Sequence, residues 1–439
     1  MAIPAASPSP PLPAHRCALP AIALWAALAT GCGDTGVGPE IPAGPILHLD
    51  GRGEALAAMA DVRPVRDEGI AFACLPGQLP AVEAAMAEYL ASLDIPAGLV
   101  GKRADRAAGR LVFTLNTPRD DSDTLSFKDR PEMGVAEATV TLPDRRGQDR
   151  AVRTVSQKEI VLALLQHGRL TEFTGGACDL EALKEHVGIR QNTVAWAEHL
   201  EWGWPDGGPA RWNRKYWQDG TPRSRVPVAE ALRDVFINQD HYAIGCYTAT
   251  KITMVQGALD YFSRVDDEPA KRRLVEDRLA ADREPLVAVE PGRMWDFDPE
   301  ADPAELGRPG KLVKVQYGVA PKNFVPGDWV YFLNTDPGSK AKTGYEGSSA
   351  IYLGRSRFND YYNDNDHAYT YREKLDEVYQ WRNGVFSRSR DAARIRPLAA
   401  EDFDRLGKPP AEGGLVMDLR VSHYLFGHEE LPALAAATP

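Results

Sequence analysis

The chain has 439 residues, of which 51 are lysine or arginine and 62 are aspartate or glutamate, so its formal net charge is −11. Apolar residues make up 44% and charged residues 26%, which excludes a chain that is disordered throughout and a fibrous repeat. The acidic balance provides no basic surface for phosphates, so we expect no nucleic-acid partner. At roughly 150 residues per domain, the length predicts two or three domains.

The first fifty residues predict export. The apolar run from Ala18 to Thr30 is too short for a bilayer about 30 Å thick, but it suits the core of a signal peptide. Small residues lead from it into Cys32, as in a bacterial lipobox, where the thiol is lipidated and the chain is cut before it. We expect a lipoprotein-type signal peptide over 1–31 and a Gly/Pro-rich tether over 32–50. Ordinary cleaved secretion and a misassigned start are the alternatives.

These features predict a protein of the cell envelope, either lipid-anchored or secreted, that meets the membrane only through the lipid on Cys32. Removal of Cys17 with the signal peptide would leave Cys74, Cys178 and Cys246 in an oxidising compartment. Three is odd, so at least one thiol is unpaired within the chain. Cys74 and Cys178 are one candidate pair, but the sequence does not establish the connectivity.

Residues 51–170 predict an N-terminal α+β domain without a chemical motif. Apolar spacing predicts a helix over 80–93, and the runs at 110–115 and 135–142 predict strands. Ser156 and Glu159 have the spacing of a capping box that opens a helix through Ile160–Leu165.

The composition changes at about residue 171, where we place the start of a second domain that extends to about 400. Five of the nine tryptophans fall within one short Gly- and Pro-containing stretch: Trp196, Trp202, Trp204, Trp212 and Trp217. We favour an irregular segment anchored by these rings over an aromatic groove for a polymer substrate.

Further elements follow in this second domain. Helices are predicted over Val228–Ile237, from Cys246 onward and over 268–283. Strands at 311–317, 329–333 and 350–353 are predicted to share one sheet, and a helix is expected over 372–381. The remaining residues, 401–439, are predicted to be a C-terminal appendage.

Cys246 has the position of a reactive thiol. Gly245 ends the lead-in, so the cysteine falls in the first turn of its helix, where the positive end of the helix dipole stabilises a thiolate and lowers the pKa from about 8.5. The plain alternative is that Cys246 is a small buried hydrophobic residue.

A family resemblance adds to this interpretation. A cysteine-headed helix, a strand after the turn Pro326-Gly327-Asp328 and a later AIYLG strand occur in the order of papain-like NlpC/P60 folds. The stretches 231–250, 325–336 and 344–354 resemble the bacterial spore-type protein-glutamine gamma-glutamyltransferases over about residues 190–370. The resemblance implies an α+β, papain-like core in which a helix-borne cysteine packs on an antiparallel sheet, with residues 171–400 as the catalytic domain.

The resemblance also implies the chemistry. Members of this family cross-link spore-coat proteins without calcium, so we expect no cofactor, no metal, and protein substrates that supply a glutamine donor and a lysine acceptor. Consistent with this, the sequence contains no H-x-x-x-H or C-x-x-C spacing, and its DYYNDND run lacks the EF-hand pattern.

The family's functional residues map only in part. The nucleophile falls on Cys246, but the glutamate expected before it is Gly245, and the second glutamate falls on Ser348. Glu346 lies two positions earlier, on the same face of the strand. His367 follows a loose match to a further family segment and could reach the site through an insertion.

The candidate general bases are therefore Glu346, His367 and His241, while Ser348 could bind backbone groups or place a water molecule. The leading prediction is a transglutaminase that forms isopeptide cross-links through a cysteine thioester. A peptidoglycan hydrolase of the NlpC/P60 kind is an alternative, although it needs a histidine where Ser348 or Ser349 stands. A catalytically inactive structural or binding lipoprotein of the same fold is another, which Gly245 and Ser348 favour.

Overall fold

The structure is a computed structural model that describes residues 68–118, 123–218, 220–281, 314–316, 320–364, 368–386, 392–417 and 420–422. All described residues belong to one compact unit, which lies within Pro39–Pro439. The predicted signal peptide and tether lie outside the described residues, as do Cys32 and His367. Within those ranges, no helix is both long and apolar enough to cross a membrane.

The first sheet has four strands in the order β2-β3-β1-β6. Its strands are β1 (Gly69–Ala73), β2 (Val100–Asp105), β3 (Arg110–Leu115) and β6 (Leu170–Thr174). The β1–β6 pair is parallel and the other two pairs are antiparallel. Helices α2 (Leu79–Ser92) and α3 (Gln157–Leu165) contact this sheet. The predictions of the first helix and of strand 110–115 are confirmed.

A separate hairpin follows the first three strands. The predicted strand at 135–142 is β4 (Ala138–Pro143), which pairs with β5 (Asp149–Thr154), an element that the sequence did not suggest. The predicted helix start at Ser156 is confirmed, because its hydroxyl accepts the Glu159 N–H at 3.2 Å.

The second large sheet has five strands in the order β13-β12-β11-β10-β14, all paired antiparallel. The strands are β10 (Trp329–Leu333), β11 (Gly347–Gly354), β12 (Arg357–Asn359), β13 (Ala368–Thr370) and β14 (Val416–Met417). The edge strand β14 comes from the segment predicted to be a C-terminal appendage. The predictions of strands at 329–333 and 350–353 in one sheet are confirmed.

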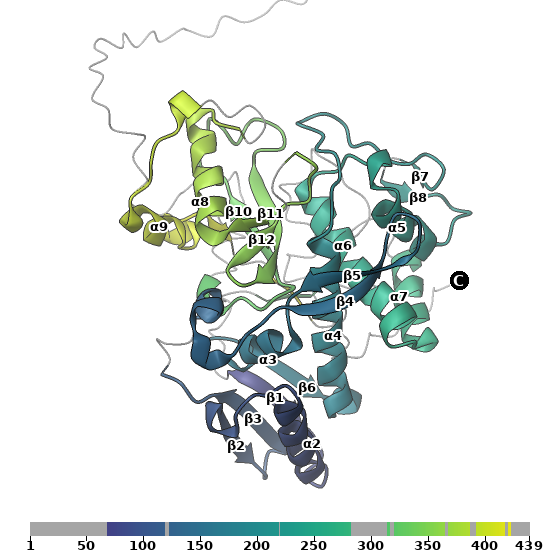
Figure 1. Ribbon diagram of the computed structural model, residues 1–439, viewed down its shortest axis with the longest axis vertical. Helices are drawn as coiled ribbons and strands as arrows, with labels where there is room; N and C mark the ends of the chain where they lie inside the picture. The colour runs from purple at the N-terminus through teal and green to yellow at the C-terminus, as the bar shows by residue number, and fades with distance from the viewer. Residues whose placement is uncertain are drawn as a thin grey trace, which may run out of the picture. The chain divides into compact units, whose positions relative to one another are not determined.

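Side chains alternate along β10 and β11, so the sheet separates two cores. Trp329, Tyr331 and Ile351 belong to the core that α6 also enters. The intervening residues Val330 and Tyr352 belong to a second core, which contains apolar side chains of helix α8. Figure 1 shows the sheet with α6 and α8 beside it. A residue's position along β11 therefore decides which helix its side chain meets.

The prediction that strand 311–317 shares this sheet is wrong. The observed strand β9 (Lys314–Gln316) pairs with β15 (Arg420–Ser422) in a two-stranded sheet. The reason is that its partner β15 lies far along the chain, so no local pattern in the sequence indicates this pairing.

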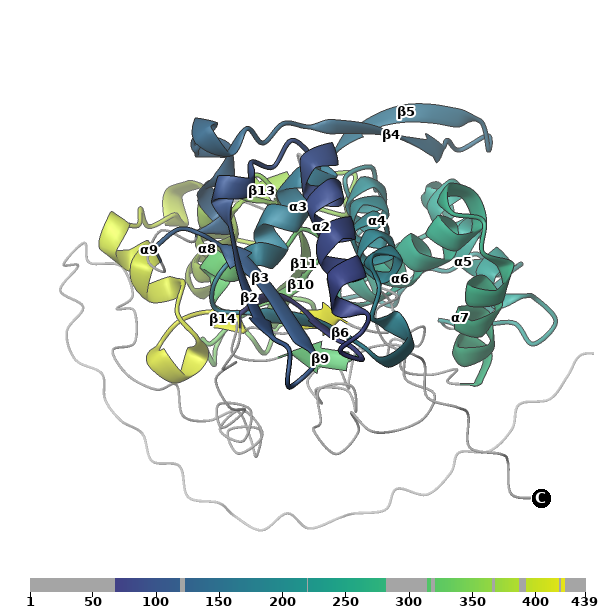
Figure 2. The ribbon, with the colours of Figure 1, turned by 90° about the horizontal axis from the view of Figure 1, so that it is seen from below.

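Helices α4 (Leu180–Ala197), α5 (Val228–Ile237), α6 (Cys246–Asp260) and α7 (Pro269–Ala281) pack together, and α4 and α6 run side by side (Figures 1 and 2). Their contact is close at Gly257, where a Cβ atom would lie 1.9 Å from Thr193 Oγ1. Both α4 and α6 also contact β11. The small sheet of β7 (Trp217–Gln218) and β8 (Thr221–Pro222) precedes α5.

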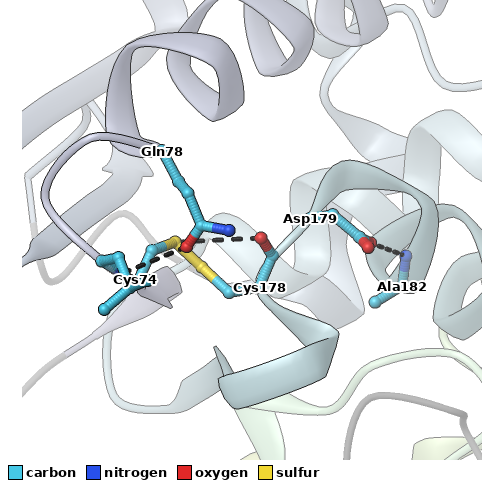
Figure 3. The surroundings of a disulfide bond; sticks show 6 residues. Cys74, Gln78, Cys178, Asp179 and Ala182 are labelled. Atoms are coloured by element: carbon cyan, nitrogen blue, oxygen red, sulfur yellow. Dashed lines mark hydrogen bonds between the residues drawn. A yellow bond between two sulfur atoms is a disulfide. The ribbon is translucent and has the colours of Figure 1, made fainter.

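A disulfide joins Cys74, at the end of β1, to Cys178, just before α4 (Figure 3). Gln78 closes the turn after the first cysteine by accepting the Leu75 N–H at 3.1 Å. Asp179 caps α4 by accepting the Ala182 N–H at 2.8 Å. The bridge therefore ties the first sheet to the helix that packs against α6.

The C-terminal helices are α8 (Tyr371–Gln380) and α9 (Ala400–Leu406). Thr370 and Glu373 form a capping box that begins α8, which contacts β10 and β12. Together these elements confirm a mixed α+β fold. The papain-like arrangement and the domain boundaries remain predictions.

Candidate active site

Cys246 is the first residue of α6, as the sequence predicted. Gly245 precedes it with φ −71° and ψ 158°, a conformation open to any residue, and the space around its missing Cβ is empty. Backbone hydrogen bonds hold the lead-in, because Gly203 and Arg211 bond to residues 242–244. The position of the thiol therefore does not depend on glycine at residue 245.

The thiol faces the beginning of strand β11. The Ser349 N–H donates a hydrogen bond to Cys246 Sγ at 3.3 Å, and the Gly347 carbonyl oxygen lies 4.0 Å from the same sulfur. A Cβ at residue 347 would lie 2.4 Å from the Tyr331 hydroxyl and 2.8 Å from the Phe332 carbonyl oxygen, so the strand passes the thiol where only glycine fits. The helix-borne cysteine thus packs against an antiparallel sheet.

Burial dominates the electrostatics of the thiol. It raises the pKa of Cys246 to about 11, since a thiolate loses its hydration there. The Ser349 N–H and the positive charge of Lys374 lower this pKa, whereas the charges of Glu346 and Glu377 raise it. The expectation that the helix terminus lowers the pKa below its ordinary value is wrong, because burial outweighs it. The resting form at neutral pH is the thiol.

Cys246 opens into a small pocket of about 30 Å³. The wall consists of aromatic rings, backbone and charged groups: Trp204, Cys246, Gly344, Tyr345, Gly347, Ser348, Asp360, Tyr362, Lys374, Glu377 and Trp381. Of the five clustered tryptophans, Trp204 alone lines the pocket. The centroid of its ring lies 5.0 Å from that of Tyr362. Trp202 and Trp217 are buried and donate their indole N–H groups to backbone carbonyls, as expected of structural anchors.

Ser348 meets a charged pair from helix α8. Lys374 Nζ lies 3.1 Å from Ser348 Oγ and 2.9 Å from Glu377 Oε2. The pair is largely buried, with side-chain exposures of 6% for Lys374 and 11% for Glu377. The position where the resemblance expected a glutamate thus holds a serine that binds a lysine, and a carboxylate is supplied from another element.

Glu346 is buried, and burial raises the pKa of its carboxyl group. One carboxylate oxygen accepts the Gly344 N–H at 2.7 Å, and the side chain does not line the pocket. Glu346 therefore acts on the thiol through its charge, from outside the pocket wall.

Of the two histidine candidates, His241 is described by the structure, and it does not line this pocket. His241 is exposed, at the end of the short helical turn Gln239–His241. None of the four histidines in the described ranges lines the pocket, and His367 lies outside those ranges. The same ranges contain no group of three potential side-chain ligands that could hold a metal ion.

Sequence reasoning missed Lys374, Glu377 and Asp360. The first two are charges three residues apart on a predicted helix, a spacing that usually marks a solvated pair. A weak signal was present, because each directly precedes an apolar residue, Leu375 or Val378, and so borders the buried face of the helix.

The fold and the site define a mixed α+β protein with a buried thiol at a helix start, facing a sheet. Residues 143–274 match the model of the TGL family, protein-glutamine gamma-glutamyltransferase. The family resemblance is therefore confirmed for this segment, which includes Cys246 and ends before the strands of the five-stranded sheet. The spore-type subclass remains a prediction.

Among solved structures, the chain is similar to a transglutaminase from Geobacillus stearothermophilus, solved without its C-terminal extension. The two are 19% identical, the match covers 58% of this chain and 97% of that chain, and the TM-score is 0.35. A comparison with curated proteins found no match.

Proposed function

We propose that the protein is a protein-glutamine gamma-glutamyltransferase with Cys246 as its nucleophile and a papain-like arrangement of its core. The observation that carries the proposal is the placement of this thiol. Cys246 begins a helix inside the segment that matches the family, and its sulfur borders a polar pocket. The same sulfur accepts a hydrogen bond from the Ser349 N–H of β11.

The proposed reaction has two halves. Cys246 Sγ attacks the carboxamide carbon of a protein glutamine, and the C–N bond breaks to release ammonia and leave a thioester. A lysine ε-amine then attacks the thioester carbon, the C–S bond breaks, and an isopeptide bond remains. The Cys246 N–H is the first of α6 and has no acceptor within the helix, so it can donate to the oxyanion in each half.

Water competes with the amine for the thioester. Trp204, Tyr345, Tyr362 and Trp381 enclose the pocket with aromatic surface, which supports aminolysis because it limits the access of bulk water. Because no described histidine lines the pocket, a cysteine–histidine hydrolase has less support from its geometry.

The envelope location is part of the same proposal. The Cys74–Cys178 disulfide supports it, since structural disulfides persist mainly in oxidising compartments. In this proposal the lipid on Cys32 holds the catalytic body near the membrane, where the protein cross-links proteins of the envelope or, if the spore-type resemblance holds, of a spore coat.

The test incubates the full chain with casein as the glutamine donor and dansylcadaverine as a fluorescent primary amine. We expect amine incorporation in the wild type and none in Cys246→Ala, while His241→Ala, at an exposed position, keeps the wild-type rate. His367→Ala runs beside them to test the remaining histidine candidate.

Other results would overturn the proposal. Incorporation that survives Cys246→Ala would exclude this thiol as the nucleophile. Ammonia release without incorporation would identify a hydrolase. A folded wild type that does neither would identify a protein that retains the fold without the chemistry.

A further inference from the structure

The proposed reaction requires a group that moves protons at the thiol. Cys246 rests as a thiol, so its proton must leave before attack and must reach the departing nitrogen. Neither position 245 nor position 348 supplies a carboxylate. Two carboxylates line the pocket beside the thiol, Asp360 and Glu377. Of these, Glu377 is ion-paired with a lysine that itself lines the pocket.

We infer that Glu377 is the general acid–base of this reaction and that Lys374 is the positioning residue that holds it at the pocket. This inference rests on the function proposed above. It assigns the proton transfer to helix α8, outside the segment that matches the family and outside all positions to which the resemblance mapped a glutamate.

The contacts of Lys374 explain how it holds the carboxylate. Its ammonium group donates to Ser348 Oγ at 3.1 Å and to Glu377 Oε2 at 2.9 Å, and it lies 4.1 Å from the centroid of the Tyr369 ring. Ser348 immediately precedes the residue whose N–H binds the thiol. The lysine therefore connects Glu377 to the same strand that positions Cys246, and its positive charge favours the thiolate.

The protons balance through one carboxylate. Glu377 accepts the thiol proton, the thiolate attacks the glutamine carbonyl, and the protonated carboxyl group gives its proton to the departing nitrogen, so ammonia leaves. In the second half, Glu377 accepts a proton from the attacking amine nitrogen and returns it to Cys246 Sγ as the C–S bond breaks. Lys374 takes no part in the transfer of these protons and positions the carboxylate in both halves.

Several charged or titratable groups face or surround the thiol, and each influences its pH dependence. They are Lys374 and Glu377 from α8, Glu346 before β11, and Asp360, Tyr361 and Tyr362 after β12. Glu346 is the competing carboxylate, but its bond to the Gly344 N–H holds it away from the pocket wall.

The experiment compares two rates in the full chain: amine incorporation into casein, and alkylation of Cys246 by iodoacetamide, each between pH 6 and 10. In Glu377→Gln the loss of a negative charge favours the thiolate, so we expect faster alkylation at pH 8. Loss of the proton carrier should nevertheless slow amine incorporation about 10²–10⁴-fold. A general loss of structure would not produce opposite changes in these two rates.

Lys374→Met should slow both rates, because the thiolate loses the nearby positive charge, and Lys374→Arg should restore part of each.

The matched control is Asp376→Asn, a carboxylate-to-amide change on the same helix whose side-chain oxygen can still accept the hydrogen bond from the Gln380 amide. It should keep both wild-type rates. Because Glu377→Gln leaves the buried charge of Lys374 without its carboxylate, the double variant Lys374→Met/Glu377→Gln removes both charges, and it should fold and remain slow in transfer.

The inference is overturned if Glu377→Gln transfers amine within about threefold of the wild type with an unchanged pH profile, a change far below the usual loss for a general acid–base. It is also overturned if Glu346→Gln or Asp360→Asn, rather than Glu377→Gln, shows the opposed changes. Either result leaves the proposed function intact, provided that Cys246→Ala abolishes transfer. If Cys246→Ala remains active, the proposed function itself fails.

Discussion

Replacement of Glu159 by glutamine should make the stability of the protein less sensitive to pH. Glu159 lies in α3 and is 1% exposed, and its carboxylate accepts the Arg355 N–H at 2.7 Å. Arg355 and Ser356 form the two-residue turn between β11 and β12, both with φ in the left-handed region, at 54° and 58°. The buried carboxylate therefore helps to hold a strained turn at the end of the strand that faces the thiol.

The size of the effect follows from the pKa. Burial raises the pKa of Glu159 from 4.5 to about 7. The hydrogen bond from the Arg355 backbone N–H and the positive charge of the Arg355 side chain both lower this pKa, but by less than burial raises it. At about 1.4 kcal/mol per pKa unit, ionisation of this group in the folded state costs about 3 kcal/mol. The neutral form is preferred on folding, so its contribution to stability is complete below pH 4.5 and is lost as the pH rises through 7.

Glutamine keeps an acceptor for the Arg355 N–H and cannot ionise. Urea unfolding, followed by tryptophan fluorescence from pH 4.5 to 8.5, should show the free energy of unfolding of Glu159→Gln rising by about 3 kcal/mol relative to the wild type across that range. Glu230→Gln, at an exposed position, is the control and should differ from the wild type by less than about 0.5 kcal/mol throughout. A difference for Glu159→Gln that stays flat or falls with pH would refute the reasoning.

Three further changes test the packing. Gly257→Ala should destabilise the fold by about 1–3 kcal/mol in thermal unfolding, because the alanine Cβ would lie 2.9 Å from Thr193 Cα. This loss should outweigh the higher helix propensity of alanine, and a stabilised variant would contradict it. Asp328→Asn removes the carboxylate between two buried arginines and should cost about 3–5 kcal/mol in urea unfolding, whereas a wild-type midpoint would show that the arginines need no anion. Replacing both Cys74 and Cys178 by serine should cost about 2–4 kcal/mol, and an unchanged urea midpoint would argue against the bridge.

Local patterns predicted the elements that carry the site. The helix that begins at Cys246 and the helix Val228–Ile237 were predicted from apolar spacing, the first also from Gly245 at the end of its lead-in, and both have the expected starts. Strand β10 was predicted at its observed bounds from a Pro-Gly turn and a continuous apolar run. These features depend on neighbours in the sequence, so the sequence alone contains the information.

The rest depends on contacts between distant residues. Strand β9 was assigned to the wrong sheet because its partner β15 comes from a distant part of the chain that no local pattern indicates. Lys374 and Glu377 had the spacing of a surface ion pair, and only the packing of α8 against the sheet buries them. The direction of the Cys246 pKa shift was predicted from its own helix, but the burial that reverses the shift comes from other elements.

The order in which the chain is synthesised gives the disulfide a second consequence. Cys74 and Cys178 both precede Cys246, whereas the strand residue that binds the Cys246 sulfur follows it by 103 positions. In the proposed export route, the thiol reaches an oxidising environment before the strand that covers it. In the mature protein of that proposal, a chain that has already joined Cys74 to Cys178 has no further cysteine to pair with Cys246, so early closure of this bridge would preserve the free thiol on which the proposed chemistry depends.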